Sequence, residues 1–216
     1  MDLTLYGYWR SSAAYRLRIA LNLKAVPYEK VSVNIAPDAS VQKSAEFQSI
    51  NPQSRVPVLK VGETYLTQSM AILEWLEETY PQPALLPTDP ILRAECRAFA
   101  DLIACDIHPI NNLSVLQALK HDFAASPEQI SDWYAHWIKI GFFALEKCAE
   151  KSRGPFLFGE APGLAEICLI PQIYNAHRYK VDMQVFPHLA AIDTKCLALE
   201  AFDRARPEHQ DEARSV

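Results

Sequence analysis

The chain has 216 residues, of which half are hydrophobic, so it can bury a substantial core in one large or two small domains. A formal net charge of -5 argues against a nucleic-acid-binding surface. No apolar run reaches the roughly 20 residues of a membrane span, and no signal-peptide pattern opens the chain, so we expect a cytoplasmic protein without a membrane partner.

The first 80 residues mix strand and helix signals. The patterns predict strands over 3–8, 28–33, 58–61 and 65–67, and helices over 13–24, 41–49 (weakly) and 70–80. In the first helix Leu17, Ala20 and Leu21 share an apolar face, while Arg16 and Arg18 fall elsewhere. The initial strand–helix–strand unit implies a right-handed crossover, so residues 1–82 are predicted to form an α/β domain.

Four prolines lie close together directly after this domain. Pro81, Pro83, Pro87 and Pro90 break any helix, which predicts a linker over 83–90. Strand signals then nearly vanish, and residues 91–216 are predicted to form an all-helical domain. Its helices are expected over 91–121 (bent at Pro109), 127–151, 164–179 and 186–202, with a charged, loose C-terminal end.

The chain has five cysteines, all in helix-like segments of the second half and without a Cys-x-x-Cys pair. This pattern predicts reduced, mostly buried thiols and neither a disulfide framework nor a metal site.

Two serines begin the first predicted helix. Ser11 and Ser12 can satisfy free backbone N–H groups, and that helix end also favours an anion such as a thiolate. From the residues alone, a purely capping role remains the alternative.

Two further segments point to ligand binding. Pro57 opens a strand, and a cis Val56–Pro57 bond would turn the Val56 backbone toward a ligand, although a trans bond is the commoner alternative. Gln68 and Ser69 lie at the start of another helix, a position that suits a carboxylate.

These signals occur in one order and spacing in a known family. The sequence resembles the cytosolic glutathione transferases and most closely their zeta class, whose signature is Ser-Ser-Cys, a small residue, an aromatic and Arg-x-Arg-Ile-Ala-Leu. The signature stands here at Ser11 to Leu21. Further matches, which extend the resemblance over essentially the whole chain, are Asn51-Pro52, Val56-Pro57, Gln68-Ser69, Leu85-Leu86-Pro87, Asn112 to Leu116, Pro171-Gln172 and Asn175 to Asp182.

The resemblance implies a thioredoxin-like N-terminal domain that binds glutathione, a helical domain that binds substrate, and a homodimer. Ser11 or Ser12 would lie against the thiol, and the backbone beside Pro57 would pair with the cysteinyl part. By the same resemblance the remaining glutathione-binding residues are Gln68 and Ser69 at the γ-glutamyl carboxylate, and His108 and Asn112 at the glycine end.

Two departures from the family pattern stand out. Ala13 occupies the position of the usual cysteine, which removes a second sulfur but leaves the serines. Gly163 and Glu166 replace the usual Ser/Thr and Asp of a capping box, at an expected cost of only a few tenths of a kcal/mol.

The zeta class implies a cis–trans isomerase in which the glutathione thiolate adds to a maleyl-type dicarboxylate and then leaves. Arg10 and Arg178 would bind its carboxylates, and the alternative for each is a solvated surface arginine. Residues 112–116 resemble the maleylacetoacetate isomerases of tyrosine and phenylalanine catabolism, whereas 106–112 resemble a bacterial maleylpyruvate isomerase of gentisate breakdown. We expect the former substrate. A general glutathione transferase or, less favoured, a non-catalytic binding module would also fit the resemblance.

Overall fold

The computed structural model describes residues 2–152 and 154–215, which form two compact units. Unit 1 contains the chain up to Ala84 and again from Leu197 onward, and unit 2 is Leu85–Cys196. The first boundary falls inside the predicted linker. The C-terminal stretch, in contrast, groups with the α/β unit and not with the helical one. Its predicted looseness is wrong, because it forms a helical turn at Pro207–His209 and buries Gln210, which is 2% exposed.

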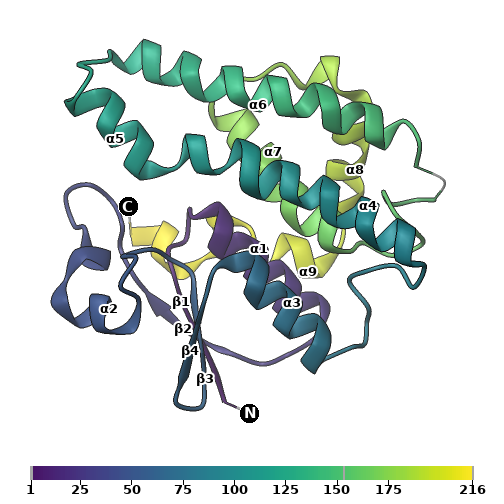
Figure 1. Ribbon diagram of the computed structural model, residues 1–216, viewed down its shortest axis with the longest axis horizontal. Helices are drawn as coiled ribbons and strands as arrows, with labels where there is room; N and C mark the ends of the chain where they lie inside the picture. The colour runs from purple at the N-terminus through teal and green to yellow at the C-terminus, as the bar shows by residue number, and fades with distance from the viewer. Residues whose placement is uncertain (1, 153, 216) are drawn as a thin grey trace. The chain divides into compact units, whose positions relative to one another are not determined.

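Unit 1 is built on a four-stranded mixed sheet in the order β2-β1-β3-β4 (Figure 1). The strands are β1 (Leu3–Gly7), β2 (Glu29–Ser32), β3 (Val58–Val61) and β4 (Thr64–Thr67). β1 pairs parallel with β2, as the predicted crossover requires, and antiparallel with β3, while β3 and β4 form a hairpin. The observed strands confirm the predicted thioredoxin-like arrangement.

The helices of unit 1 are α1 (Ser12–Leu23), α2 (Ala45–Ile50), α3 (Ser69–Thr79) and the short α9 (Glu200–Asp203). α1 packs on both α3 and α9, so almost all of its side chains are buried. Even Arg16 and Arg18, which lie off the predicted apolar face, are only 2% and 3% exposed. The sequence pattern therefore located the helix but not the burial of its charges.

The regular elements of unit 2 are all helices over its described residues, apart from one isolated β-bridge between Phe156 and Gly159. Its α-helices are α4 (Pro90–Asp101), α5 (Leu113–His121), α6 (Pro127–Ala149), α7 (Leu164–Arg178) and α8 (Pro187–Leu197). α7 forms the centre of the core, with α4 and α6 packed against it and most of its residues buried. The predicted helix over 186–202 is in fact α8 and α9, separated by a break.

The prediction of one bent helix over 91–121 is also wrong. α4 ends at Asp101, a π-helical turn follows over Leu102–Ile107, and a 3-10 turn at Pro109–Asn111 precedes α5. Pro109 has no N–H, so the α-helical hydrogen bonding cannot continue through it. Gly141 of α6 accommodates the wider turn, since a Cβ there would lie 2.2 Å from Ile107 Cδ1.

The start of α7 shows how glycine and glutamate replace the usual residues of the capping box. Glu166 accepts hydrogen bonds from the N–H groups of Gly163 (2.8 Å) and Leu157 (2.7 Å). A Cβ at Gly163 would lie 2.4 Å from the Leu85 carbonyl oxygen, which accepts a bond from Leu164 N at 2.8 Å. Glycine is therefore required here by the close approach of the Leu85 backbone. No helix in the described part of the chain is long and apolar enough to cross a membrane.

Candidate active site

The N-terminus of α1 presents the two serines predicted from the sequence. Ser11 is the N-cap: its Oγ accepts a hydrogen bond from Ala14 N at 3.3 Å, and its own N–H donates to Tyr8 O at 3.0 Å. Ser12 is the first helical residue and is 8% exposed. The capping bond uses an oxygen lone pair of Ser11, so its hydroxyl hydrogen can still be donated to an anion at the positive end of the helix. Capping and anion stabilisation are thus compatible.

The loop before β3 contains the Val56–Pro57 bond, which is cis. The alternative of a trans bond, left open by the sequence, is therefore wrong. Pro57 is buried and Val56 is half-buried, packing against a small apolar cluster around Phe47. Asn51 orders the loop by donating from Nδ2 to Arg55 O at 2.8 Å.

The N-terminus of α3 holds the predicted pair Gln68 and Ser69. Gln68 is the N-cap residue, has a positive φ of 68°, and donates from Nε2 to Gln53 Oε1 at 2.7 Å. Ser69 is buried, and its Oγ accepts a hydrogen bond from Arg16 Nη1 at 3.2 Å. This bond joins the start of α3 to the middle of α1 within the same unit.

Arg16 is a candidate site residue that the sequence reasoning missed. Its Nε and Nη2 atoms are buried and have no hydrogen-bond partner in residues 2–152 and 154–215. A guanidinium is always charged, and each unsatisfied buried donor costs about 1–3 kcal/mol. The Arg16 charge lies behind the Ser69 hydroxyl at the start of α3, where it favours an anion at this helix end. The sequence feature that could have revealed it is its position between Tyr15 and Leu17, which are both core residues.

The other predicted unit 1 residue, Arg10, is exposed. Its guanidinium lies over the Trp9 ring, 4.9 Å from the ring centroid. This cation–π contact holds the side chain in the same turn as Ser11 but leaves its donors accessible.

Unit 2 contains the remaining predicted residues. His108 is half-buried at the end of the π-helical turn, where its N–H donates to Ile103 O at 2.9 Å. Asn112 is the N-cap of α5, and its Oδ1 accepts a hydrogen bond from Ser114 N at 2.9 Å. The amide nitrogen of Asn112 takes no part in this cap.

Arg178 lies exposed in the last turn of α7. Its Nη1 donates to Asn175 Oδ1 at 3.3 Å, and its guanidinium lies 5.5 Å from the centroid of the Tyr179 ring. Tyr179 in turn stacks on Tyr134 at 3.7 Å, which gives the arginine an aromatic platform. The predicted glutathione residues Ser11, Ser12, Val56, Pro57, Gln68 and Ser69 thus belong to unit 1 together with Arg10, whereas His108, Asn112 and Arg178 belong to unit 2.

The cysteines differ in their burial, and burial excludes Cys96 as a nucleophile. None of the five forms a disulfide; Cys96, Cys168 and Cys196 are buried, while Cys105 and Cys148 are exposed. Burial raises the pKa of the Cys96 thiol to about 12, so this thiol stays neutral. The position of the missing family cysteine, Ala13, is itself buried at 8% exposure. In the described residues no three His, Cys, Asp or Glu side chains are grouped to hold a metal ion.

Comparisons with known proteins extend these observations. Residues 1–78 match the family model described as glutathione S-transferase, N-terminal domain. The maleylacetoacetate isomerase of Mus musculus is 43% identical over 206 residues, covering 95% of this chain and 93% of that protein. A solved structure of a maleylpyruvate isomerase, described as a bacterial glutathione S-transferase in the zeta class, is 44% identical with a TM-score of 0.94 and covers 97% of this chain and 99% of that chain. A maleylacetoacetate isomerase structure from Methylobacterium extorquens AM1 with bound malonate and GSH is 37% identical and has a TM-score of 0.92. The match covers 97% of this chain and 98% of that chain.

Proposed function

The chain belongs to the zeta class of the glutathione transferase family, and on this premise we propose that it is a glutathione-dependent cis–trans isomerase of maleylacetoacetate in tyrosine and phenylalanine catabolism. One observation carries the proposal: unit 1 presents a hydroxyl donor at one helix N-terminus and a buried, partly unpaired arginine at another. Glutathione carries a thiol and a γ-glutamyl carboxylate, which match these two positions. The residues present therefore fit this cofactor.

The first position activates the thiol. A free thiol has a pKa of about 8.5, so only a few per cent is ionised at neutral pH. Lowering that pKa by about two units requires about 2.7 kcal/mol. A hydrogen bond from Ser11 to the charged form contributes about 1.5–3 kcal/mol, and the end of α1 contributes up to about 2 kcal/mol. These two contributions are sufficient, with Ser12 as the second candidate donor.

The second position binds the carboxylate. Ser69 lies at the start of α3, and Arg16 places a full positive charge directly behind its hydroxyl. The exposed Gln68 side chain supplies a further amide donor at the same helix end. We assign the cysteinyl backbone to Val56 and Pro57, and the glycine carboxylate to His108 and Asn112.

When bound, glutathione supplies a thiolate that adds reversibly to the cis double bond, allows rotation about the resulting single bond and leaves unchanged. The protein must orient the dicarboxylate and stabilise charge that develops on the carbonyl side. We assign one substrate carboxylate to Arg178, whose fork of donors suits bidentate binding, and keep Arg10 as the second cation. Unit 1 is then the glutathione-binding domain and unit 2 the substrate-binding domain.

Maleylpyruvate is the second candidate substrate. Residues 106–112 favour it by their resemblance to the bacterial enzyme, and the maleylpyruvate relative is about as similar to this chain as the mouse enzyme is. We keep maleylacetoacetate as the main proposal because residues 112–116 resemble the maleylacetoacetate isomerases.

The test measures glutathione binding by the purified protein and then turnover of both substrates. We expect binding, and a higher kcat/KM with maleylacetoacetate than with maleylpyruvate. The reverse order would establish the second candidate. Conjugation of foreign electrophiles without isomerisation would indicate a general transferase, and binding without turnover would indicate a non-catalytic module.

We further propose a cytoplasmic homodimer. A sedimentation mass of one chain, 24.4 kDa, would contradict the dimer.

A further inference from the structure

Arg18 connects two parts of unit 1 that are far apart in the sequence. From its place on α1 it donates from Nη2 to the Trp9 carbonyl oxygen and from Nε to the Ala205 carbonyl oxygen, both at 2.9 Å. The side chain is 3% exposed, and its guanidinium lies 5.2 Å from the centroid of the Tyr15 ring. The planar fork of an arginine can make both bonds at once in a fixed geometry.

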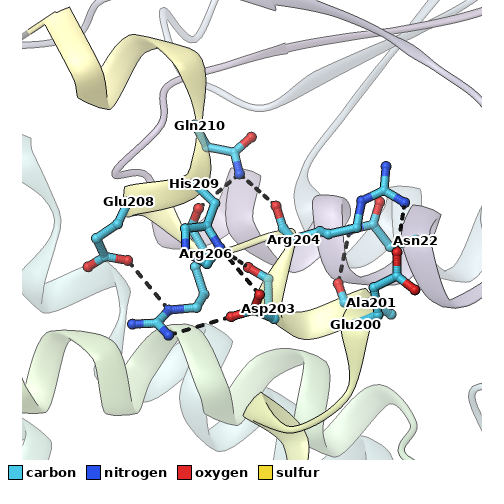
Figure 2. A network of polar contacts seen from close by, with 9 residues as sticks. All are labelled: Asn22, Glu200, Ala201, Asp203, Arg204, Arg206, Glu208, His209 and Gln210. Carbon is cyan, nitrogen blue, oxygen red and sulfur yellow. Dashed lines mark hydrogen bonds and ion pairs between the residues drawn. The ribbon is translucent and has the colours of Figure 1, made fainter.

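The Ala205 carbonyl acceptor belongs to a segment that is itself held in place by hydrogen bonds (Figure 2). We call Glu200–Gln210 the C-terminal segment. Asn22 of α1 donates from Nδ2 to Ala201 O at 2.9 Å. At the other end, the buried Gln210 donates from Nε2 to the carbonyl oxygens of Arg204 and Arg206, at 2.9 and 2.8 Å. The backbone on both sides of Ala205 is therefore ordered.

The other acceptor, Trp9, lies in the turn that presents Ser11. The turn Tyr8–Ser11 is closed by the hydrogen bond from Ser11 N to Tyr8 O at 3.0 Å. A group that stabilises charge acts well only when it is held within about 0.5 Å of its productive position. The bond from Arg18 to Trp9 O restrains the middle of this turn, two residues before the serine.

We propose that Arg18 is a positioning residue through which the C-terminal segment holds the Tyr8–Ser11 turn, and hence the Ser11 hydroxyl, in the geometry that ionises the thiol. The C-terminal segment is thereby part of the active-site support, although no residue of it is assigned to glutathione. The consequence for the thiol rests on the proposed function, whereas the restraint on the turn does not.

The test separates these two claims by using two measurements. Amide hydrogen exchange at Ser11 in the ligand-free protein reports opening of the turn, because this N–H is bonded to Tyr8 O. The ultraviolet absorbance of bound glutathione against pH reports the thiol pKa. The main variant is Arg18→Lys, which keeps the charge but cannot donate to two carbonyl groups in the same fixed geometry. The matched control is Arg204→Met, which removes an exposed arginine of the same segment, 3.5 Å from Glu200.

We expect Arg18→Lys to accelerate Ser11 exchange about tenfold, as the loss of one hydrogen bond to a charged group implies. The bound-thiol pKa should rise by about one unit, or about tenfold less thiolate at neutral pH. Gln210→Ala, which leaves Arg18 intact but loosens its acceptor, should shift both readouts in the same direction by a smaller factor. The Arg204→Met control should match the wild type in both.

Unchanged Ser11 exchange in both Arg18→Lys and Gln210→Ala overturns the proposal. Faster exchange with an unchanged thiol pKa also overturns it, because Arg18 would then support the fold alone. If the wild-type protein does not bind glutathione, the proposed function fails, and the exchange data still decide whether Arg18 restrains the turn.

Discussion

The two units bury charges of opposite sign. Among the side chains that the structure describes, the buried charged residues of unit 1 are Arg16, Arg18 and Lys24, all on α1 or at its C-terminal end, and those of unit 2 are Glu146 and Glu166. Each charge must be compensated, because an isolated ion in a protein interior costs several kcal/mol. The way in which each unit compensates its charges shows what those charges do.

In unit 2 the buried carboxylates complete helix N-termini. Glu166 accepts two backbone N–H bonds at the start of α7, and Glu146 accepts those of His188 (2.9 Å) and Leu189 (3.1 Å) at the start of α8. These groups are satisfied within the fold. In unit 1, by contrast, Arg16 keeps two buried donors without a partner in the described chain. The buried charges of unit 2 therefore serve folding, whereas the Arg16 charge of unit 1 lies behind Ser69 at the start of α3, where it favours an anion.

The largest effect should come from Lys24, the most fully compensated cation of unit 1. Its Nζ donates to Glu77 Oε2 (2.9 Å), Tyr80 O (2.5 Å) and Pro83 O (2.9 Å). Lys24→Met should lower the free energy of unfolding by about 3–5 kcal/mol, the cost of removing one member of a buried ion pair. Denaturant unfolding measures this. As a control, Lys147→Met removes an exposed pair with Glu150 and should leave the midpoint unchanged.

Next in size is the loss of the proposed thiol donor, Ser11. Ser11→Ala removes a hydrogen bond to a charged group, worth about 1.5–3 kcal/mol, so isomerisation should fall by about ten- to a hundredfold. Glutathione should still bind within a few-fold, because the carboxylate position at Ser69 is untouched. Ser12→Ala should have a smaller effect. The bound-thiol pKa measures the change, and an unchanged pKa in Ser11→Ala would show that another group activates the thiol.

Arg178 extends the comparison between the units, because it is an exposed cation in the unit whose buried charges are carboxylates. Arg178→Met should lower kcat/KM for isomerisation by about ten- to a hundredfold, the cost of one charged hydrogen-bond partner. Conjugation of glutathione with a neutral electrophile should be spared. Equal loss of both activities would assign Arg178 to the fold or to glutathione binding, and no loss of either would make Arg10 the substrate cation.

These contrasts explain which features the sequence could predict. Ser11 and Ser69 follow from local signals, because a serine before an apolar periodic run marks a helix start. The burial of Arg16 and Arg18 does not follow, because their acceptors lie 53 and 187 residues away at Ser69 and Ala205. Local periodicity contains no information about such distant partners.

The same limit applies to two of the wrong predictions, the single helix over 91–121 and the loose C-terminal end. The break after Asp101 depends on Gly141 of α6, which makes room for the π-helical turn, so Pro109 alone could not indicate where the helix would change. The C-terminal end is charged and looks loose in sequence. It is ordered because Gln210 and Ala205 are buried against α1 and their own neighbouring turns.

A smaller effect should come from the cap of α7. Serine is the better N-cap in general, so propensity alone predicts that Gly163→Ser stabilises the protein. The structure predicts the opposite, because the new Cβ would lie 2.4 Å from Leu85 O, a backbone atom. We expect a loss of about 1–3 kcal/mol, as for other overpacked positions. Gly159→Ala is the control and should be neutral, since no atom lies within 4 Å of its Cβ position.

The smallest effect is on the pH dependence of the unfolding free energy. It is predicted for two carboxylates of unit 2 that lie at helix N-termini. Burial raises the pKa of Glu166 above 4.5, although the N–H groups of Gly163 and Leu157 oppose the shift. Hydrogen bonds from its own backbone N–H and from Ser126 lower the pKa of the exposed Glu128.

The two shifts have opposite consequences for stability. A raised pKa means that the folded state binds the proton more tightly, so the Glu166 contribution is present below about pH 4.5 and is lost as pH rises through the folded value. The Glu128 contribution is present above its unfolded pKa and is lost as pH falls. One fully coupled proton changes the unfolding free energy by at most about 1.4 kcal/mol per pH unit.

We therefore expect Glu166→Gln to make the unfolding free energy rise more steeply with pH above pH ~4.5 than in the wild type, because a term that falls with pH is removed. Glu128→Gln should change the slope in the opposite sense, at lower pH. Denaturant unfolding at a series of pH values measures both. A Glu166→Gln profile parallel to the wild type would mean that the backbone N–H groups fully offset burial, and that Glu166 stays ionised with an ordinary pKa in the folded protein.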